Sequence, residues 1–387
     1  MREIGVITVA RSDYGIYLPV LRKIKNAQDL RLYLIVAGMH LSPEYGMTVR
    51  MIESDGFRVD ERIEMLLSSD TPEGIAKSIG LGVLGFAQVY ARHRPDILLV
   101  LGDRYEMYAG ALAALPFKIP LAHIHGGEVT EGAIDDAMRH SITKLSHLHF
   151  VSTKEYARRV VQLGEEPWRI VVSGAPSLDN MRSITLLTKS EIETQFGLRL
   201  QQPFMAVTMH PVTLEFEQLE WQVSELLDAL DKSEMPVVFT MPNADTGSRT
   251  IVRMIADYVQ NHELAQKIEN LGTKGYFSML NLADVMVGNS SSGIVEAALF
   301  KLPVVNIGNR QRGRVRNVNI IDVGYHRDEI IAGIRRARSP EFRNGLRNLE
   351  NPYGDGHAAD RIVKVLKKIN LDDRLMIKKF MDYPIEC

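Results

Sequence analysis

The chain has 387 residues, of which 45% are hydrophobic and 24% charged, and its formal net charge is −2. This length is sufficient for two domains of ordinary size, each with its own core. The near-neutral charge argues against nucleic acid as the main partner, because binding to a phosphate backbone needs a concentrated basic face. The single cysteine is Cys387, so no internal disulfide is possible and we expect a cytoplasmic protein. No apolar run approaches membrane-spanning length, and no membrane association is expected.

The first half of the chain alternates short apolar runs with amphipathic stretches. The opening MREIGVITVARSD carries one basic residue before a short apolar run and lacks a typical cleavage site, so it predicts a strand over residues 4–9 and no signal peptide. Further strands are predicted at residues 31–38, 96–102, 119–125 and 148–152. Helices are predicted at residues 17–26, 108–117 and 136–146.

The same pattern returns after about residue 200, with apolar runs at residues 204–209, 236–241, 284–289 and 302–308. Continuous apolar strands that alternate with helices are typical of a parallel sheet covered on both faces. The sequence therefore predicts an α/β fold with two doubly wound domains, joined near SGAPSLDNM at residues 173–181.

Polar, glycine-containing signatures follow directly on most of these strands. They include ARSDYG, AGMHLS, GDRYE, HGGE, HPVT, PNADTGS, GNSSSG and GNRQRGR. Ligands bind outside the carboxyl ends of the strands in open parallel sheets. If the two domains face each other, we expect these loops to line one interdomain cleft.

Two neighbouring signatures in the second half favour a diphosphate or nucleotide ligand. GNSSSGIVEAALF reads as a strand, a serine-rich turn and a helix whose free N–H groups could bind an anion. NIGNRQRGRVR then supplies arginines, which suit bidentate phosphate binding. The simpler alternatives are a plain helix cap and a solvated basic loop. Neither domain has G-x-G-x-x-G after its first strand and no Walker A sequence is present, which argues against a dehydrogenase.

The densest group of ionisable residues begins at HIHGGE. His123 and His125 alternate along the predicted strand and could ligate one metal, as in hydrolases with an H-x-H pair. The alternatives are one packed and one solvated histidine, or a wall that contacts a sugar. In IDDAMRH, Asp135 and Arg139 share one helix face, as surface ion pairs often do.

The ordered set of motifs resembles the hydrolysing UDP-N-acetylglucosamine 2-epimerases of bacterial sialic-acid pathways. The resemblance rests on ARSDYG, LGDRYE, HIHGGE, IDD..RHSITK, HPVT, NADTGS, GNSSSG..E, VNIGNRQRGR and YGDG, and it extends from about residue 4 to residue 370. It implies a GT-B-like fold of two Rossmann-like domains with the active site in their cleft. The expected domains are residues 1–177 and 178–356, with the C-terminal helix at 357–387 crossing back to the first domain.

The resemblance also implies roles for individual residues, which are transferred motif by motif. The catalytic candidates are Asp103, His125, Glu128, Asp135, Arg139 and His210. The candidates for binding the UDP-sugar are Arg11, His40, Arg104, Asn243, Tyr276, Ser290, Ser291, Glu296 and Arg310. No metal or other cofactor is expected, and a homodimer or homotetramer is expected. His125 stands where distant relatives carry a catalytic Glu, so either His125 or Glu128 takes over that role.

The implied reaction converts UDP-N-acetylglucosamine and water to UDP and N-acetylmannosamine by elimination and hydration. Three alternatives remain open. The same reaction could act on UDP-N,N'-diacetylbacillosamine, because that sugar differs only at C4 and C6. A GT-B glycosyltransferase would need an acceptor subsite but no base at C2. A nucleotide-sugar sensor would not need the catalytic acids that the motifs supply.

Overall fold

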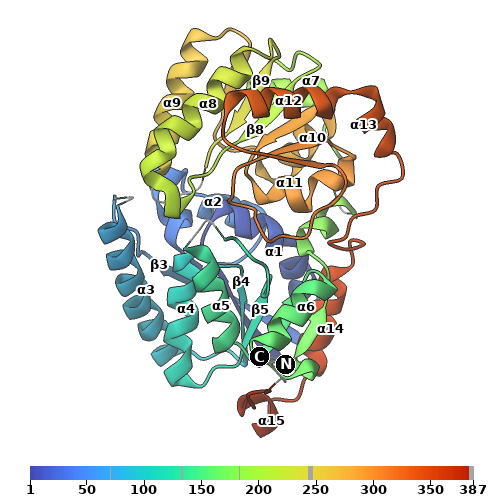
Figure 1. The fold of residues 1–387 in the computed structure, drawn as a ribbon. Helices are drawn as coiled ribbons and strands as arrows, with labels where there is room; N and C mark the ends of the chain where they lie inside the picture. Colours follow the sequence, from blue (N-terminus) through green and yellow to red (C-terminus); the bar gives the residue numbers. More distant parts are fainter. Residues whose placement is uncertain (70, 132–133, 183, 243–246, 383–387) are drawn as a thin grey trace. The chain divides into compact units, whose positions relative to one another are not determined.

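The structure is a computed structural model that describes residues 1–69, 71–131, 134–182, 184–242 and 247–382. Its contacts divide the chain into two compact units. We call residues 1–128, 135–182 and 353–387 the N-terminal unit, and residues 129–134 and 183–352 the C-terminal unit. Figure 1 shows both units along the chain.

A seven-stranded sheet in the order β3-β2-β1-β4-β5-β6-β7 forms the centre of the N-terminal unit, and all its neighbouring strands are parallel. The strands are β1 (Arg2–Thr8), β2 (Leu30–Ala37), β3 (Glu61–Ile63), β4 (Ile97–Leu101), β5 (Leu121–Ile124), β6 (Leu148–Val151) and β7 (Ile170–Val172). β4, β5 and β6 are buried along their whole length. Such strands read as continuous apolar runs in the sequence, because helices cover both faces of a parallel sheet.

The helices of this unit fall into groups that contact each other. α3, α4 and α5 pack side by side, and α1 packs on α14 (Figure 1). The helices are α1 (Arg11–Lys25), α2 (Val49–Ser54), α3 (Pro72–Arg92), α4 (Tyr105–Ala114), α5 (Asp135–Leu145), α6 (Lys154–Gln162), α14 (Ala358–Lys368) and α15 (Asp373–Met376). The three predicted helices correspond to α1, α4 and α5 and are confirmed.

Helix α3 corrects the expectation that no apolar stretch reaches membrane-spanning length. Its 21 residues are long and apolar enough to cross a membrane by length and composition alone. In this fold the helix packs against α4 so closely that a Cβ at Gly82 would lie 2.9 Å from the Cβ of Ala109. Core helices of soluble proteins meet the same criteria, so α3 is weak evidence for a membrane.

A second parallel sheet, in the order β10-β9-β8-β11-β12-β13, forms the C-terminal unit. Its strands are β8 (Met205–Thr208), β9 (Val237–Thr240), β10 (Ala265–Ile268), β11 (Val285–Gly288), β12 (Val304–Ile307) and β13 (Ile320–Val323). Its helices are α7 (Lys189–Phe196), α8 (Leu219–Asp231), α9 (Ser248–Asn261), α10 (Gly272–Leu282), α11 (Ser291–Val295), α12 (Arg327–Arg338) and α13 (Pro340–Gly345).

Two hydrophobic cores lie on opposite faces of this second sheet. Alternate residues of β8 enter different cores: Met205 and Val207 join one, and Ala206 joins the other. Successive side chains of a strand point to opposite faces, so each strand contributes to both layers. This explains why the predicted strands are apolar at every position.

Each sheet reverses its strand order at one place. In the N-terminal unit β1 lies between β2 and β4, and in the C-terminal unit β8 lies between β9 and β11. Connections leave such neighbouring strands in opposite directions, and ligands of doubly wound folds bind in the crevice at that switch point. Arg11 and Asp103 follow β1 and β4, while His210 and Ser290 follow β8 and β11. Four of the predicted site residues therefore lie at the two switch points, and others follow the neighbouring strands β5 and β12.

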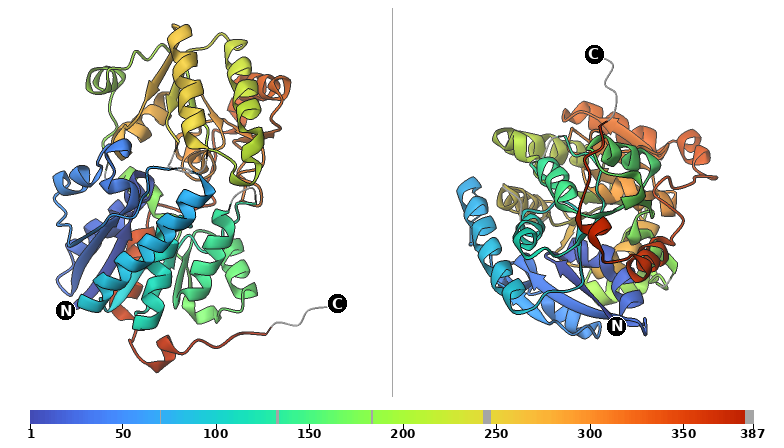
Figure 2. Two further views of the ribbon diagram at one scale, coloured as in Figure 1. Left: turned by 90° about the vertical axis from the view of Figure 1, so that its left-hand side faces the viewer. Right: turned by 90° about the horizontal axis from the view of Figure 1, so that it is seen from below.

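The chain re-enters the N-terminal unit at Tyr353, so α14 and the segment after it both belong to this unit. Figure 2 shows α15 at the end of this unit where β1 begins, away from the carboxyl ends of the strands. The buried Arg169 donates hydrogen bonds to the carbonyl oxygens of Arg374, Leu375 and Ile377, at 2.8, 2.7 and 3.1 Å respectively. The segment around α15 therefore packs on the end of the sheet that lies opposite the candidate site.

Candidate active site

The turn after β1 is held together by Asp13. Its carboxylate accepts hydrogen bonds from the backbone N–H groups of Val9 and Ala10 at 2.8 and 2.9 Å. This fixes the start of α1, where Arg11 is the first residue. His40 has no exposed surface, and its ring nitrogens contact the hydroxyls of Thr8 and Thr48 at 2.9 and 2.7 Å. His40, which the resemblance assigns to the sugar, is thus a buried side chain that supports this turn.

Asp103 and Arg139 form an ion pair that joins the loop after β4 to helix α5. Asp103 follows β4 and is 22% exposed at its side chain, whereas the side chain of Arg139 on α5 is almost completely buried. The sequence gives no direct sign of this pairing, since the two residues are far apart in the chain. A carboxylate held beside a buried guanidinium stays ionised and is oriented for contact with a ligand.

Arg104 is committed to a second, internal ion pair. Its Nε and Nη2 atoms each lie 3.1 Å from a carboxylate oxygen of Glu106, which has no exposed surface. Arg104 itself is 9% exposed. If Arg104 contacts a UDP-sugar as predicted, it does so with a guanidinium that already pairs with a buried carboxylate.

His125 and Glu128 form a pair at the carboxyl end of β5. The Nδ1 atom of His125 lies 2.6 Å from Oε1 of Glu128, and the Ser152 hydroxyl donates to the same carboxylate at 3.0 Å. An ionised carboxylate can only accept, so Nδ1 carries the hydrogen and Nε2 is the nitrogen that can take up a proton. The sequence posed His125 and Glu128 as alternatives, and the structure joins them in one unit.

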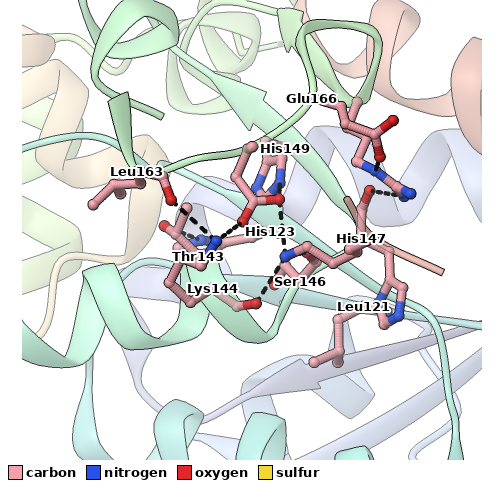
Figure 3. Close-up of polar contacts among 12 residues, drawn as sticks. Leu121, His123, Thr143, Lys144, Ser146, His147, His149, Leu163 and Glu166 are labelled. Atoms are coloured by element: carbon pink, nitrogen blue, oxygen red, sulfur yellow. Dashed lines mark hydrogen bonds and ion pairs between the residues drawn. The ribbon is translucent and has the colours of Figure 1, made fainter. Parts of the chain in front are cut away.

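His123 is more deeply buried than His125 and has different hydrogen-bond partners. It has no exposed surface, and burial lowers the pKa of its imidazole to about 3. Its Nε2 atom contacts the Gly102 carbonyl at 2.8 Å. Its Nδ1 atom contacts the Thr143 hydroxyl at 3.1 Å (Figure 3). His125 lies beyond the strand with a φ of +67°, so the alternation assumed for an H-x-H metal pair does not hold. Within the described residues, no group of three or more His, Cys, Asp or Glu could hold a metal ion.

Asp135 is the first residue of α5, one turn before Arg139. The neighbouring Asp136 pairs with His140 at 3.4 Å, as the i,i+4 spacing predicts. Acidic residues in the first turn of a helix also interact favourably with its dipole. The helix therefore presents Asp135 at its start and Arg139 one turn further on.

In the C-terminal unit, Asn289 connects three of the predicted loops. Its side-chain amide exchanges two hydrogen bonds with the backbone of His210, at 2.7 and 2.9 Å. The backbone carbonyl of Asn289 accepts hydrogen bonds from the side chains of Arg310 at 3.3 Å and Gln311 at 2.8 Å. Sequence reasoning missed Asn289, although it stands inside GNSSSG. The available signal was its position directly after the apolar run that ends at Gly288, and in the structure its side chain has no exposed surface.

The serine turn after β11 combines hydroxyl groups with a very short helix. Ser290 caps α11 by accepting from the N–H of Ser292 at 3.3 Å, and Ser291 begins the helix. Tyr276 interacts with the hydroxyls of Ser290 and Ser292, while burial raises the pKa of its phenol well above the usual value. Glu296 ends α11 after only five helical residues, so the helix dipole is much weaker than the sequence suggested.

The arginine loop after β12 is largely neutralised from within. Arg312 lies 3.3 Å from Glu131, and Arg316 pairs with Asp322 at 3.0 Å. Arg310 is the member that reaches the serine turn, through the Asn289 carbonyl. The sequence suggested that the whole arginine loop faces a phosphate. In the structure two of its arginines pair with carboxylates, and Arg310 is the one that reaches the serine turn. Asn243, also predicted to contact the nucleotide, lies outside the described residues.

One unit carries the Asp103–Arg139 and His125–Glu128 pairs after β4 and β5, and the other carries hydroxyl, amide and arginine groups after β11 and β12. Such polar groups beyond the carboxyl ends of parallel strands are typical of doubly wound α/β enzymes. Comparison with known proteins narrows this class. Residues 22–367 match the family described as UDP-N-acetylglucosamine 2-epimerase. The chain belongs to this family.

Among its relatives is the GDP/UDP-N,N'-diacetylbacillosamine 2-epimerase (hydrolyzing) of Campylobacter jejuni, which is 38% identical over 98% of this chain and 99% of its own length. The UDP-N,N'-diacetylbacillosamine 2-epimerase (hydrolyzing) of Legionella pneumophila is 37% identical over 98% of this chain and 99% of its own length. The resemblance to the family is thereby confirmed, whereas these two relatives are not named for the sialic-acid pathway that the motifs suggested.

The fold is also that of solved structures. The UDP-GlcNAc 2-epimerase of Neisseria meningitidis, whose structure was determined bound to UDP-GlcNAc, matches with a TM-score of 0.81 at 19% identity. The match covers 95% of this chain and the whole of that one. The predicted fold class of two Rossmann-like, GT-B-like parallel-sheet domains is confirmed.

Proposed function

We propose that the protein is a hydrolysing 2-epimerase that converts UDP-N,N'-diacetylbacillosamine and water to UDP and the 2-epimeric free sugar. The observation that carries the proposal is the pairing of His125 with Glu128 just after β5. β5 pairs with β4, and the Asp103–Arg139 ion pair lies just after β4. These groups belong to a chain that is similar along 98% of its length to two epimerases with that substrate in their names.

The second candidate keeps the reaction and changes the sugar to UDP-N-acetylglucosamine. The description of the matching family favours it, and it is the substrate that the motifs suggested first. We rank it second because the two relatives are named for the diacetylated sugar. Both sugars carry the 2-acetamido group at which the configuration changes, so the acid–base groups would serve either one.

The chemistry explains why such a site needs paired ionisable groups. The C2–H bond of the sugar has no adjacent carbonyl and is too weakly acidic for simple proton abstraction. If the C1–O bond to UDP breaks at the same time, positive charge develops at C1 and the C2 proton can be removed. The products of this step are UDP and a 2-acetamidoglucal. Water then adds across the double bond, with hydroxide at C1 and a proton delivered to the opposite face of C2.

We assign these steps to residues of the N-terminal unit. Nε2 of His125 accepts the first proton, and Glu128 stabilises the imidazolium that forms. Asp103 and Asp135 are assigned to activation of water and return of the proton to C2. Arg139 keeps Asp103 ionised and oriented.

The departing UDP is assigned to residues at the two switch points. Ser290, Ser291 and Tyr276 supply hydroxyl donors, and Arg310 supplies positive charge near the same turn. Arg11, at the start of α1, is the proposed diphosphate contact of the N-terminal unit. A phosphate leaving group is stabilised by such donors without a metal, so we expect activity to survive a strong chelator. A cytoplasmic location remains part of the proposal.

The decisive experiment incubates the protein in D₂O with UDP-N,N'-diacetylbacillosamine, its GDP analogue and UDP-N-acetylglucosamine. We expect release of UDP and a manno-configured product with deuterium at C2, identified by NMR. The substrate with the highest kcat/KM decides between the two sugars, and the GDP arm decides the nucleobase. A gluco-configured product that keeps its C2 hydrogen would instead indicate a glycosyltransferase or a simple hydrolase.

A further inference from the structure

His123 is a buried histidine for which the mechanism above has no use. It lies on β5, and its side chain connects two segments that carry catalytic candidates. Its Nε2 atom lies 2.8 Å from the carbonyl of Gly102, the residue before Asp103. Its Nδ1 atom lies 3.1 Å from the hydroxyl of Thr143 on α5 (Figure 3). Thr143 stands one helical turn after Arg139, and its hydroxyl also contacts the Arg139 carbonyl at 3.0 Å.

The hydrogen-bonding capacity of these groups fixes the form of the imidazole. A carbonyl can only accept, so the hydrogen of the neutral ring must sit on Nε2 and be donated to Gly102. Nδ1 is then an acceptor, and it faces the Thr143 hydroxyl, which also donates to the carbonyl of Arg139. That hydroxyl has one hydrogen and two acceptors, His123 and the carbonyl of Arg139. The neutral tautomer therefore couples the loop before Asp103 to the helix that carries Arg139.

A third segment packs against the same contact. A Cβ added to Gly126 would lie 3.1 Å from both Nδ1 of His123 and Oγ1 of Thr143. Gly126 lies between His125 and Glu128, so the loop that carries this pair rests directly on the His123–Thr143 hydrogen bond. A side chain at this position would force His123 or Thr143 to move by a few tenths of an ångström.

We propose that His123 and Thr143 form a positioning pair that aligns the Asp103 loop, the His125–Glu128 loop and helix α5 for catalysis. The inference rests on the proposed function for the roles of Asp103, His125 and Arg139, but its structural part can be tested without turnover. Neither residue touches the reacting atoms, since both are fully buried. Their effect passes through the backbone of Gly102 and Gly126 and through the axis of α5.

The test compares three variants at two hydroxyl-bearing residues, Thr143 on α5 and Ser146 directly after it. Thr143→Val keeps the shape of the side chain but removes the donor to His123, and Thr143→Ser restores it. Ser146→Ala is the matched control, because Ser146 is also buried and donates to a carbonyl four residues back, Ile142, at 2.7 Å. Within the described part of the chain, its hydroxyl makes no hydrogen bond to His123.

We expect Thr143→Val to lower kcat about 10- to 100-fold, because small displacements of catalytic groups are costly. KM and the affinity for UDP should change less than twofold. Thr143→Ser should recover most of the rate, and Ser146→Ala should behave as wild type even if its melting temperature falls. Wild-type kcat in a folded Thr143→Val protein would overturn the proposal.

A second readout does not depend on the reaction. Carbon-13 NMR of the aspartate carboxyl groups follows the titration of Asp103, which Arg139 holds in its ionised form. In Thr143→Val the pKa of Asp103 should rise relative to wild type, whereas Ser146→Ala should leave it unchanged. If no UDP-sugar is turned over, the proposed function fails and this titration still tests the alignment. An unchanged titration of Asp103 in Thr143→Val would overturn the positioning role.

Discussion

The pair formed by His125 and Glu128 is the arrangement at the residue scale from which most of the proposed chemistry follows. Glu128 is almost completely buried and lies 2.6 Å from Nδ1 of His125. A buried carboxylate fixes the tautomer of its histidine and stabilises the cation that forms when Nε2 takes up a proton. Ser152 donates to the same carboxylate at 3.0 Å, which limits its rotation.

We expect Glu128→Gln to lower kcat by about 100-fold or more, because the amide keeps the shape but cannot stabilise the imidazolium. The affinity for UDP, measured by calorimetry, should stay within twofold of wild type. Glu131→Gln is the control, since Glu131 is exposed, lies three residues further on and pairs with Arg312. Equal turnover in both variants would show that Glu128 only supports the loop.

Asp103 offers a second test at the residue scale. Asp103→Asn removes the carboxylate that faces the buried guanidinium of Arg139. We expect kcat to fall about 100-fold or more and the melting temperature to fall as well, because a buried charge loses its partner. Asp136→Asn removes a more exposed i,i+4 partner of His140 on the same helix and should cost only a few tenths of a kcal/mol. A fully active Asp103→Asn protein would contradict the assignment.

The sequence predicted most of the residues at the two switch points, because the motifs that carry them follow the strands directly. It could not predict how the side chains pair. The Asp103–Arg139 pair depends on how the loop after β4 meets α5, which no local pattern encodes. The Arg104–Glu106 pair joins residues only two positions apart at the start of α4. The alternation of His123 and His125 was misleading because β5 ends at Ile124 and His125 adopts a left-handed backbone.

At the scale of elements, the turn from β11 to α11 has the strictest geometric requirement. Gly288 has a φ of +129°, and a Cβ there would lie 2.0 Å from the carbonyl oxygen of Thr208 on β8. Such a distance is far inside van der Waals contact, so any side chain must push the two strands apart. The neighbouring Asn289 and Ser290 would move with the backbone.

We therefore expect Gly288→Ala to weaken UDP binding at least tenfold and to lower the melting temperature. Gly80→Ala provides the control, because Gly80 lies in α3 with no atom within 4 Å of an added Cβ. That substitution should stabilise the helix by up to about 1 kcal/mol and leave UDP binding unchanged. Calorimetric titration with UDP measures both variants. Normal affinity in Gly288→Ala would show that the serine turn does not hold the nucleotide.

The elements that the sequence predicted and those it missed differ in position within the sheets. The nine predicted strands are confirmed, and all of them lie inside a sheet, with a neighbouring strand on each side. The missed strands are the four edge strands. β3 and β7 form the two edges of the first sheet, and β10 and β13 form the two edges of the second. They have three or four residues and include polar or exposed positions. An edge strand needs no continuous apolar run, so the pattern that identifies a central strand is absent.

At the scale of the whole molecule, the N-terminal unit contains buried ionisable groups that link its stability to pH. Burial lowers the pKa of His123 to about 3 and that of His147 to about 4. Burial alone would raise the pKa of Glu165, but hydrogen bonds from His149, Lys144 and Lys378 lower it to about 2. Figure 3 shows several of these residues around the start of β6 and the end of α5.

The direction of the pH effect follows from these shifts. Each of the two histidines has a lower pKa in the folded state than the 6.5 of an unfolded chain. The unfolded state therefore binds protons first as the pH falls below about 6.5, and folding loses stability. Glu165 adds to the loss between about pH 4.5 and 2, because its carboxylate is protonated more easily in the unfolded chain. Stability from all three groups is complete only above about pH 6.5.

We expect the free energy of unfolding to fall by about 1.4 kcal/mol per pH unit for each of these histidines between about pH 6 and pH 4. Urea titrations at a series of pH values measure this slope. His147→Asn should reduce it, because the amide oxygen can still accept from the N–H of Leu121, as Nδ1 of His147 does at 3.1 Å, but does not titrate. His326→Asn is the control, since that histidine is 70% exposed at its side chain. An identical slope in wild type and His147→Asn would mean that His147 is protonated as readily in the folded protein as in the unfolded chain.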